Sequence, residues 1–110
     1  MTPRKIAANY LFLPGRPLLR AAYAVVEDGR VAGVVDTGGV LRELPRMEFY
    51  GGLLVDAAAC DGVDWRPGDD ILARLRERYA CGVTGALALV EGADLARFRW
   101  LPSTRVTRLR

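Results

Sequence analysis

Hydrophobic residues in the first half of the chain occur in short runs that are typical of β-strands. The pattern predicts strands over residues 5–13, 18–27, 30–36 and 47–56. Between the second and third runs stand Asp28 and Gly29, a pair that tolerates positive φ at both positions of a tight turn. We therefore expect a two-residue β-hairpin at this point.

Glycines interrupt this strand pattern at two places. Gly51 and Gly52 lie inside the fourth predicted strand. Paired glycines within a strand indicate a β-bulge or a close approach of another backbone segment. Thr37, Gly38 and Gly39 follow the third predicted strand and are expected to end it.

A helical period replaces the strand pattern in the middle of the chain. Residues 57–68 have the Asp, Gly and Pro content of a loop. The apolar residues that follow recur at helical spacing, at Ile71, Leu72, Leu75 and Tyr79. They predict an amphipathic helix over 69–81, with acidic residues at its N-terminus and Gly82 as its C-terminal cap. Its apolar side needs a sheet face to pack on.

Strand pattern returns in the last quarter of the chain, over residues 85–91 and 105–110. The expected fold class is therefore mainly β with one α-helix, arranged as a small β-sandwich or flattened barrel in a single domain, 1–110. The domain divides into N-terminal strands (1–56), a loop plus helix (57–82) and C-terminal strands (83–110).

Composition supports one compact globular domain. The chain has 110 residues, of which 51% are hydrophobic and 26% charged, so extensive disorder is excluded. Its formal net charge is only +3. A small basic excess is not the clustered patch of a nucleic-acid-binding protein, so nucleic acid is not an expected partner.

The N-terminal residues do not have the pattern of a secretory signal. Arg4 and Lys5 precede an apolar run, but residues 14–17, Pro-Gly-Arg-Pro, cut that run short. No stretch of the sequence has membrane-spanning length. We therefore expect a cytoplasmic protein without a membrane partner, in which Cys60 and Cys81 are reduced thiols.

The sequence lacks the residues that most catalytic sites need. It contains no histidine, which removes the usual zinc ligand and the usual general base. Several aspartates follow one another in the central loop, at Asp56, Asp61, Asp64, Asp69 and Asp70. They offer a hard cation oxygen ligands, although aspartates in loops more commonly bond to local backbone. We expect no catalytic residue, no cofactor and no metal ligand.

Several segments together resemble the amidohydrolase superfamily, the metal-dependent hydrolases of the cytosine deaminase and chlorohydrolase type. The segments are KIAANYLFL, AAYAVVEDGRVAGVVDTGG, EFYGGLLV and residues 85–110. In that family such strands, from both ends of the chain, build a small composite β-sandwich beside a catalytic TIM barrel. The resemblance covers residues 4–56 and 83–110 and implies the composite sandwich here.

The same resemblance implies that the catalytic part of the family is missing. In the family, the strand similar to EFYGGLLV is followed by Pro-Gly and by a His-x-His pair that binds the metal. Here Val55 is followed by DAAACD, and a loop and one helix stand in place of the barrel. We therefore expect a pseudoenzyme, a non-catalytic interaction or structural protein that forms a homodimer or binds another protein.

A sandwich without its barrel is expected to expose apolar surface, and the candidate interface residues are Trp65, Phe98, Trp100 and Leu101. The simpler interpretation is that the two tryptophans cap the ends of the core.

Two other functions remain open from the sequence. One is a small-ligand or cation-binding protein, or a residual hydrolase, that uses the loop between Asp56 and Asp70. The other is a weak anion or nucleic-acid binder that uses the C-terminal arginines, namely Arg97, Arg99, Arg105, Arg108 and Arg110.

Overall fold

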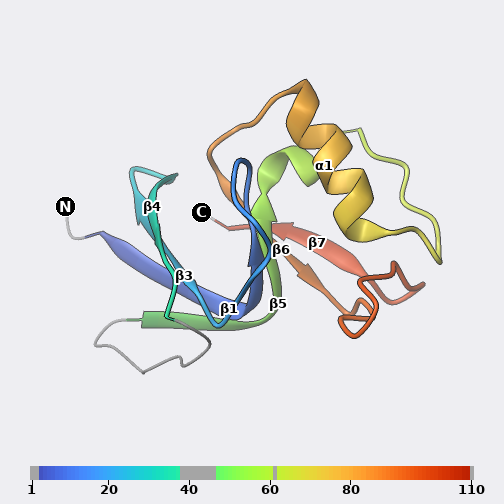
Figure 1. Cartoon of the computed structure of the whole chain (residues 1–110), viewed down its shortest axis with the longest axis horizontal. Coiled ribbons are helices and arrows are strands. Elements are labelled where there is room, and N and C mark those ends of the chain that lie inside the picture. The colour runs from blue at the N-terminus through green and yellow to red at the C-terminus, as the bar shows by residue number, and fades with distance from the viewer. Residues whose placement is uncertain (1–2, 38–46, 61, 110) are drawn as a thin grey trace.

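The computed structural model describes residues 3–37, 47–60 and 62–109 (Figure 1). Its elements, in chain order, are β1 (Arg4–Phe12), β2 (Leu19–Arg20), β3 (Tyr23–Glu27), β4 (Arg30–Val35), β5 (Met47–Asp56), the 3-10 helix η1 (Ala57–Cys60), α1 (Ile71–Cys81), β6 (Leu87–Glu91) and β7 (Arg105–Arg108). The predicted class, mainly β with a single α-helix, is confirmed. The predicted breaks at Gly38 and Gly39 lie outside the described residues.

All strands of the described residues belong to one mixed sheet with the order β4-β3-β1-β5-β6-β7, in which β2 also pairs with β1. The long strands β1 and β5 run parallel at its centre, and the other neighbouring strands are antiparallel. The predicted sandwich or flattened barrel thus takes the form of one continuous sheet that is not closed into a barrel.

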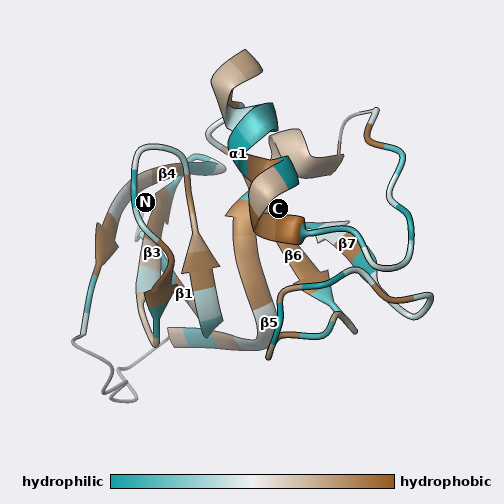
Figure 2. Ribbon diagram, turned by 45° about the vertical axis from the view of Figure 1, so that its right-hand side comes forward, coloured by the Kyte–Doolittle hydropathy of each residue, from teal (hydrophilic) through white to brown (hydrophobic). Residues whose placement is uncertain are grey.

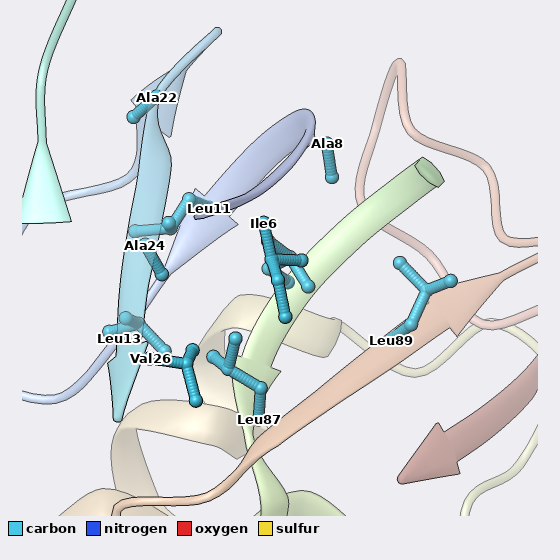
Figure 3. Packing of buried hydrophobic residues seen from close by; sticks show 10 residues of the cluster. Ile6, Ala8, Leu11, Leu13, Ala22, Ala24, Val26, Leu87 and Leu89 are labelled. Carbon is cyan, nitrogen blue, oxygen red and sulfur yellow. The ribbon is translucent and has the colours of Figure 1, made fainter. Parts of the chain in front are cut away.

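The sheet curls around a hydrophobic core on its inner face. Ala24 and Val26 of β3 pack in the same cluster as Leu87 and Leu89 of β6, although β1 and β5 lie between these strands in the sheet (Figure 3). Such contacts require the two halves of the sheet to face each other. A backbone hydrogen bond from Val31 N to the oxygen of Gly85, 2.8 Å long, joins the two halves at one corner.

Helix α1 packs on the outer face of the other half of the sheet. Figure 2 shows α1 lying over the half of the sheet that contains β5 and β6. Ile71 and Leu75 are fully buried in a second cluster with side chains of β1, β5 and β6. The helix begins at Ile71 because Asp70, with extended backbone, is its N-cap and accepts a hydrogen bond from Ala73 N at 3.1 Å. The predicted packing of a helix on a sheet face is confirmed.

The two glycine predictions in the first half of the chain are also confirmed. Asp28 and Gly29 both have positive φ, 52° and 77°, and form the turn of the β3–β4 hairpin. Gly51 and Gly52 together stand opposite the single residue Asn9, which makes a bulge in β5. A Cβ atom on Gly52 would lie 2.3 Å from the oxygen of Val90, so the close backbone approach exists as well.

Several predicted boundaries were wrong. The helix begins at Ile71 and not at residue 69, and the last strand ends at Arg108, before Leu109. The run 18–27 is split into β2 and β3 at Ala21, whose φ is 56° and whose N–H donates to Asn9 O at 3.2 Å. The strand predicted over 85–91 begins only at Leu87, because residues 84 and 85 are bonded to the Asp56 carboxylate. The loop predicted over 57–68 contains the helical turn η1.

Candidate interaction surfaces

Asp56 ends β5 and is 3% exposed, the only buried charged residue in the described part of the chain. Its Oδ1 accepts hydrogen bonds from Ala58 N (2.9 Å), Thr84 N (3.0 Å) and Thr84 Oγ1 (2.8 Å), and its Oδ2 accepts one from Gly85 N (2.9 Å). Burial alone raises the pKa of this carboxyl, but the hydrogen bonds outweigh it and hold the pKa below its usual value. The carboxylate therefore joins η1 to the segment before β6.

The other described aspartates of the central loop lie nearer the surface than Asp56, and each contacts a neighbouring group. Asp64 is exposed, and its carboxylate lies 3.6 Å from Arg66 Nη2. Asp69 Oδ2 accepts from Arg66 N at 2.9 Å and lies 3.4 Å from Arg74 Nη1. Asp70 caps α1 and lies 3.5 Å from Arg99. Over the described residues no three His, Cys, Asp or Glu side chains come close enough together to hold a metal ion. Asp61 lies outside the described residues.

Tyr79 of α1 links the helix to the ends of the two central strands. Its hydroxyl donates to Phe12 O at 2.7 Å and accepts from Asp56 N at 3.0 Å. Burial raises the pKa of this phenol strongly, so it stays protonated and remains a donor. The hydroxyl therefore satisfies the strand-end groups where the parallel ladder stops.

Trp65 and Trp100, two of the predicted interface residues, lie against each other. Their rings are stacked, with centroids 4.7 Å apart and planes at 6°. The Arg74 guanidinium lies 5.4 Å from the centre of the Trp65 ring, and Trp65 Nε1 donates to Ala59 O at 3.4 Å. Both rings are half-buried against the cluster under α1. Much of their apolar surface is therefore already covered within this chain.

The other two predicted interface residues differ in exposure. Phe98 packs edge-on against Tyr10 at 5.1 Å, and its carbonyl oxygen accepts from Ile71 N, so it is part of the support for α1. Leu101, which is 37% exposed, is the only one of the four among the exposed large hydrophobic residues. The structure thus brings Trp65, Trp100 and Phe98 together around one core cluster, with Leu101 beside it.

The described C-terminal arginines are distributed over different segments and strand faces. Arg99 is paired with Asp70, and its neighbour Arg97 lies in an irregular segment. Arg105 and Arg108 are three residues apart on β7, so they point to opposite faces of the strand. Arg110 lies outside the described residues.

Sequence reasoning missed a different apolar surface, on the outer side of the first half of the sheet. The strand registers align four side chains in a row across neighbouring strands, namely Val35, Tyr23, Ala7 and Phe49. An adjacent row on the same face consists of Gly33, Val25, Lys5 and Met47. We call these eight residues the outer face.

The outer face lies opposite the inner core, because residues alternate sides along a strand. None of its side chains belongs to either core cluster, and α1 covers the other half of the sheet (Figure 2). Phe49 is 55% exposed and Val35 is 38% exposed. The signal for this surface is present in the sequence, since β3, β4 and β5 carry apolar residues on both sides while the chain predicts only one helix.

Comparisons with protein-family models, with curated proteins and with solved structures found no match to this chain, so an amidohydrolase relationship is not shown. Within the described residues, no helix has both the length and the apolar character needed to cross a membrane.

Proposed function

We propose that this protein is a non-catalytic interaction protein that associates with a second copy of itself. The observation that carries the proposal is the outer face, a half-sheet that α1 does not cover and whose apolar row includes the exposed side chains of Val35 and Phe49. Contiguous apolar surface of this kind is typical of contact sites. The outer face therefore replaces the surface formed by Trp65, Phe98, Trp100 and Leu101 as the first candidate interface.

Charge on the outer face favours a two-fold partner. Lys5 lies in the second row, and Glu27 lies further along β3 on the same side of the strand as Val25. Neither side chain is ion-paired within the described part of the chain. A two-fold axis through the face brings Lys5 of each copy towards Glu27 of the other, which makes the surface complementary to itself.

The contacts of the loop aspartates support the proposal that the protein is non-catalytic. Asp56, Asp69 and Asp70 accept hydrogen bonds from backbone N–H groups. Asp64, Asp69 and Asp70 each lie within 4.0 Å of an arginine of the same chain. If the resemblance to the amidohydrolases reflects common descent, the protein corresponds to their composite sandwich without the catalytic barrel. We also propose that it acts in the cytoplasm. Protein loaded with zinc, iron or manganese and then dialysed is expected to keep less than one equivalent by elemental analysis.

The association is tested by light scattering coupled to size exclusion at high micromolar concentration. Wild type is expected at about twice the 12.0 kDa chain mass. Phe49→Lys places a charge at the most exposed apolar side chain of the row, at its β5 end, and is expected to give monomers. Leu101→Lys is the matched control, since it introduces the same charge at an exposed apolar residue beside the Trp65–Trp100 stack.

Three results contradict the proposal. A wild-type monomer removes self-association altogether. A dimer that survives Phe49→Lys and is lost in Leu101→Lys assigns the contact to the Trp65–Trp100 surface. Stoichiometric, tightly held metal overturns the non-catalytic assignment.

A further inference from the structure

A groove lies between α1 and the loop that follows β1, with a volume of about 450 Å³. Its apolar lining comes from Phe12, Leu13, Pro14, Pro17 and Tyr79. Pockets for small ligands commonly have volumes of about 300 to 1,000 Å³ and are lined mainly by apolar and aromatic side chains with a few polar groups. The volume and the mainly apolar lining of this groove fall within that description, and the groove is open to solvent on one side.

Both charged side chains that line the groove are positive. Arg16 and Arg76 line it, and no acidic residue does. Neither guanidinium is ion-paired within the described residues, whereas Arg66, Arg74 and Arg99 each lie within 4.0 Å of an aspartate. The groove therefore offers two cationic groups to an anion that the chain itself does not supply.

Arg76 is also held in position. Its guanidinium carbon lies 5.4 Å from the centre of the Phe12 ring, the distance of a cation–π contact. The Arg76 guanidinium thus lies directly above the apolar side chains that line the groove, which we call its floor. A ligand that presents a carboxylate to the guanidinium groups places its apolar body against the floor at the same time.

We propose that this groove binds a small carboxylate with an apolar body. The planar guanidinium of arginine matches a carboxylate with two parallel N–H···O bonds. Inorganic phosphate contacts the guanidinium groups but gains nothing from the apolar lining, so it is expected to bind more weakly than a carboxylate with an apolar body. None of the outer-face residues lines the groove, so this inference and the proposed self-association stand or fall independently.

The probe is 4-phenylbutyrate, titrated at pH 7 into ¹⁵N-labelled protein and followed by amide chemical shifts. Saturable shifts are expected at Gly15, Arg16 and Ala80, with a Kd on the order of 1 mM for a ligand of this size. Two controls use the same wild-type protein. The neutral isostere 4-phenylbutan-1-ol is expected to bind about tenfold more weakly or worse, and inorganic phosphate likewise.

Variants identify the groups that bind. Arg16→Gln and Arg76→Gln each remove one positive charge at an exposed residue, and each is expected to weaken phenylbutyrate binding about tenfold. Arg97→Gln, an exposed arginine outside the groove, is the matched control and is expected to bind like wild type. The amide spectrum of each variant shows whether it is folded.

The proposal is overturned if the alcohol binds as tightly as the carboxylate, or if the shifts occur at residues outside the groove. It is also overturned if folded Arg16→Gln and Arg76→Gln variants keep wild-type affinity, or if phenylbutyrate gives no saturable shift.

Discussion

Asp56 Oδ1 accepts two hydrogen bonds from Thr84, one from its backbone N–H at 3.0 Å and one from its hydroxyl at 2.8 Å. The two residues are far apart in the sequence, and their contact joins the end of β5 to the segment that leads into β6. Because the carboxylate is buried, it replaces water as the acceptor for three backbone N–H groups.

Replacing Asp56 with Ala is therefore expected to lower the free energy of unfolding by about 3 to 5 kcal/mol, since one buried and two part-buried N–H groups lose their acceptor. Thr84→Val removes the hydroxyl but keeps the backbone N–H, and it is expected to cost only about 1 to 2 kcal/mol. Urea unfolding followed by circular dichroism measures both. Equal midpoints for Asp56→Ala and wild type contradict the assigned role.

Stability is also expected to fall in acid because of Asp56. Its pKa in the folded protein lies below the usual value of 3.8, so the charged form favours folding. The contribution is complete above about pH 4 and is lost as the pH falls through the folded-state pKa. The Asp56→Asn variant has no carboxylate to protonate at this position. The unfolding free energy of wild type should therefore exceed that of Asp56→Asn by less at pH 2 than at pH 5.

Glu48 serves as an internal reference in that experiment. Its pKa is also lowered, chiefly by the hydrogen bond from Arg4, and it is present in both proteins. Acid sensitivity from Glu48 therefore cancels in the comparison. A constant difference between wild type and Asp56→Asn across the pH range contradicts the prediction.

Gly52→Ala is expected to destabilise the protein by about 2 to 4 kcal/mol. The added Cβ would lie 2.3 Å from Val90 O, and the φ of 138° is one that residues with a side chain rarely adopt. Gly51→Ala is the matched control, because its nearest neighbour, Asn9 Oδ1, is 3.9 Å away, and it is expected to cost less than about 1 kcal/mol. Thermal unfolding of the two variants distinguishes the positions, and similar losses contradict the assigned clash.

Leu75→Ala is expected to lower the free energy of unfolding by about 2 to 5 kcal/mol. The Leu75 side chain is fully buried where α1 packs on the sheet. Leu72 is only half-buried on the same helix, so Leu72→Ala is expected to cost less. Denaturant unfolding measures both variants. If Leu75→Ala melts like wild type, α1 is not packed on this face.

Local features of the sequence were sufficient to predict most of the elements. The Asp28–Gly29 turn, the acidic N-terminus of α1 and the Gly82 cap depend on the φ preferences and hydrogen bonds of neighbouring residues, so they can be recognised without knowledge of the fold. The Gly51–Gly52 pair indicated a bulge for the same reason. The backbone that approaches Gly52, at Val90, is distant in the sequence and was not predictable.

The candidate sites depended much more on tertiary structure. An aspartate cluster in the sequence is compatible with a cation site, and only the fold shows that Asp56, Asp69 and Asp70 each bond to different neighbours. The stacking of Trp65 on Trp100 likewise required two loops to meet.

The sequence by itself determined a mainly β chain with one helix and without imidazole groups, because these properties follow from residue type and period. Only the tertiary structure decided which apolar residues are covered. Strands with apolar residues on both sides, such as β3, are compatible with burial of either face. Because the sheet curls, the inner face of β3 is the one that is buried in the core. The single helix then covered half of the outer side, which left Val35 and Phe49 exposed, since helix and sheet pack only where their apolar surfaces meet.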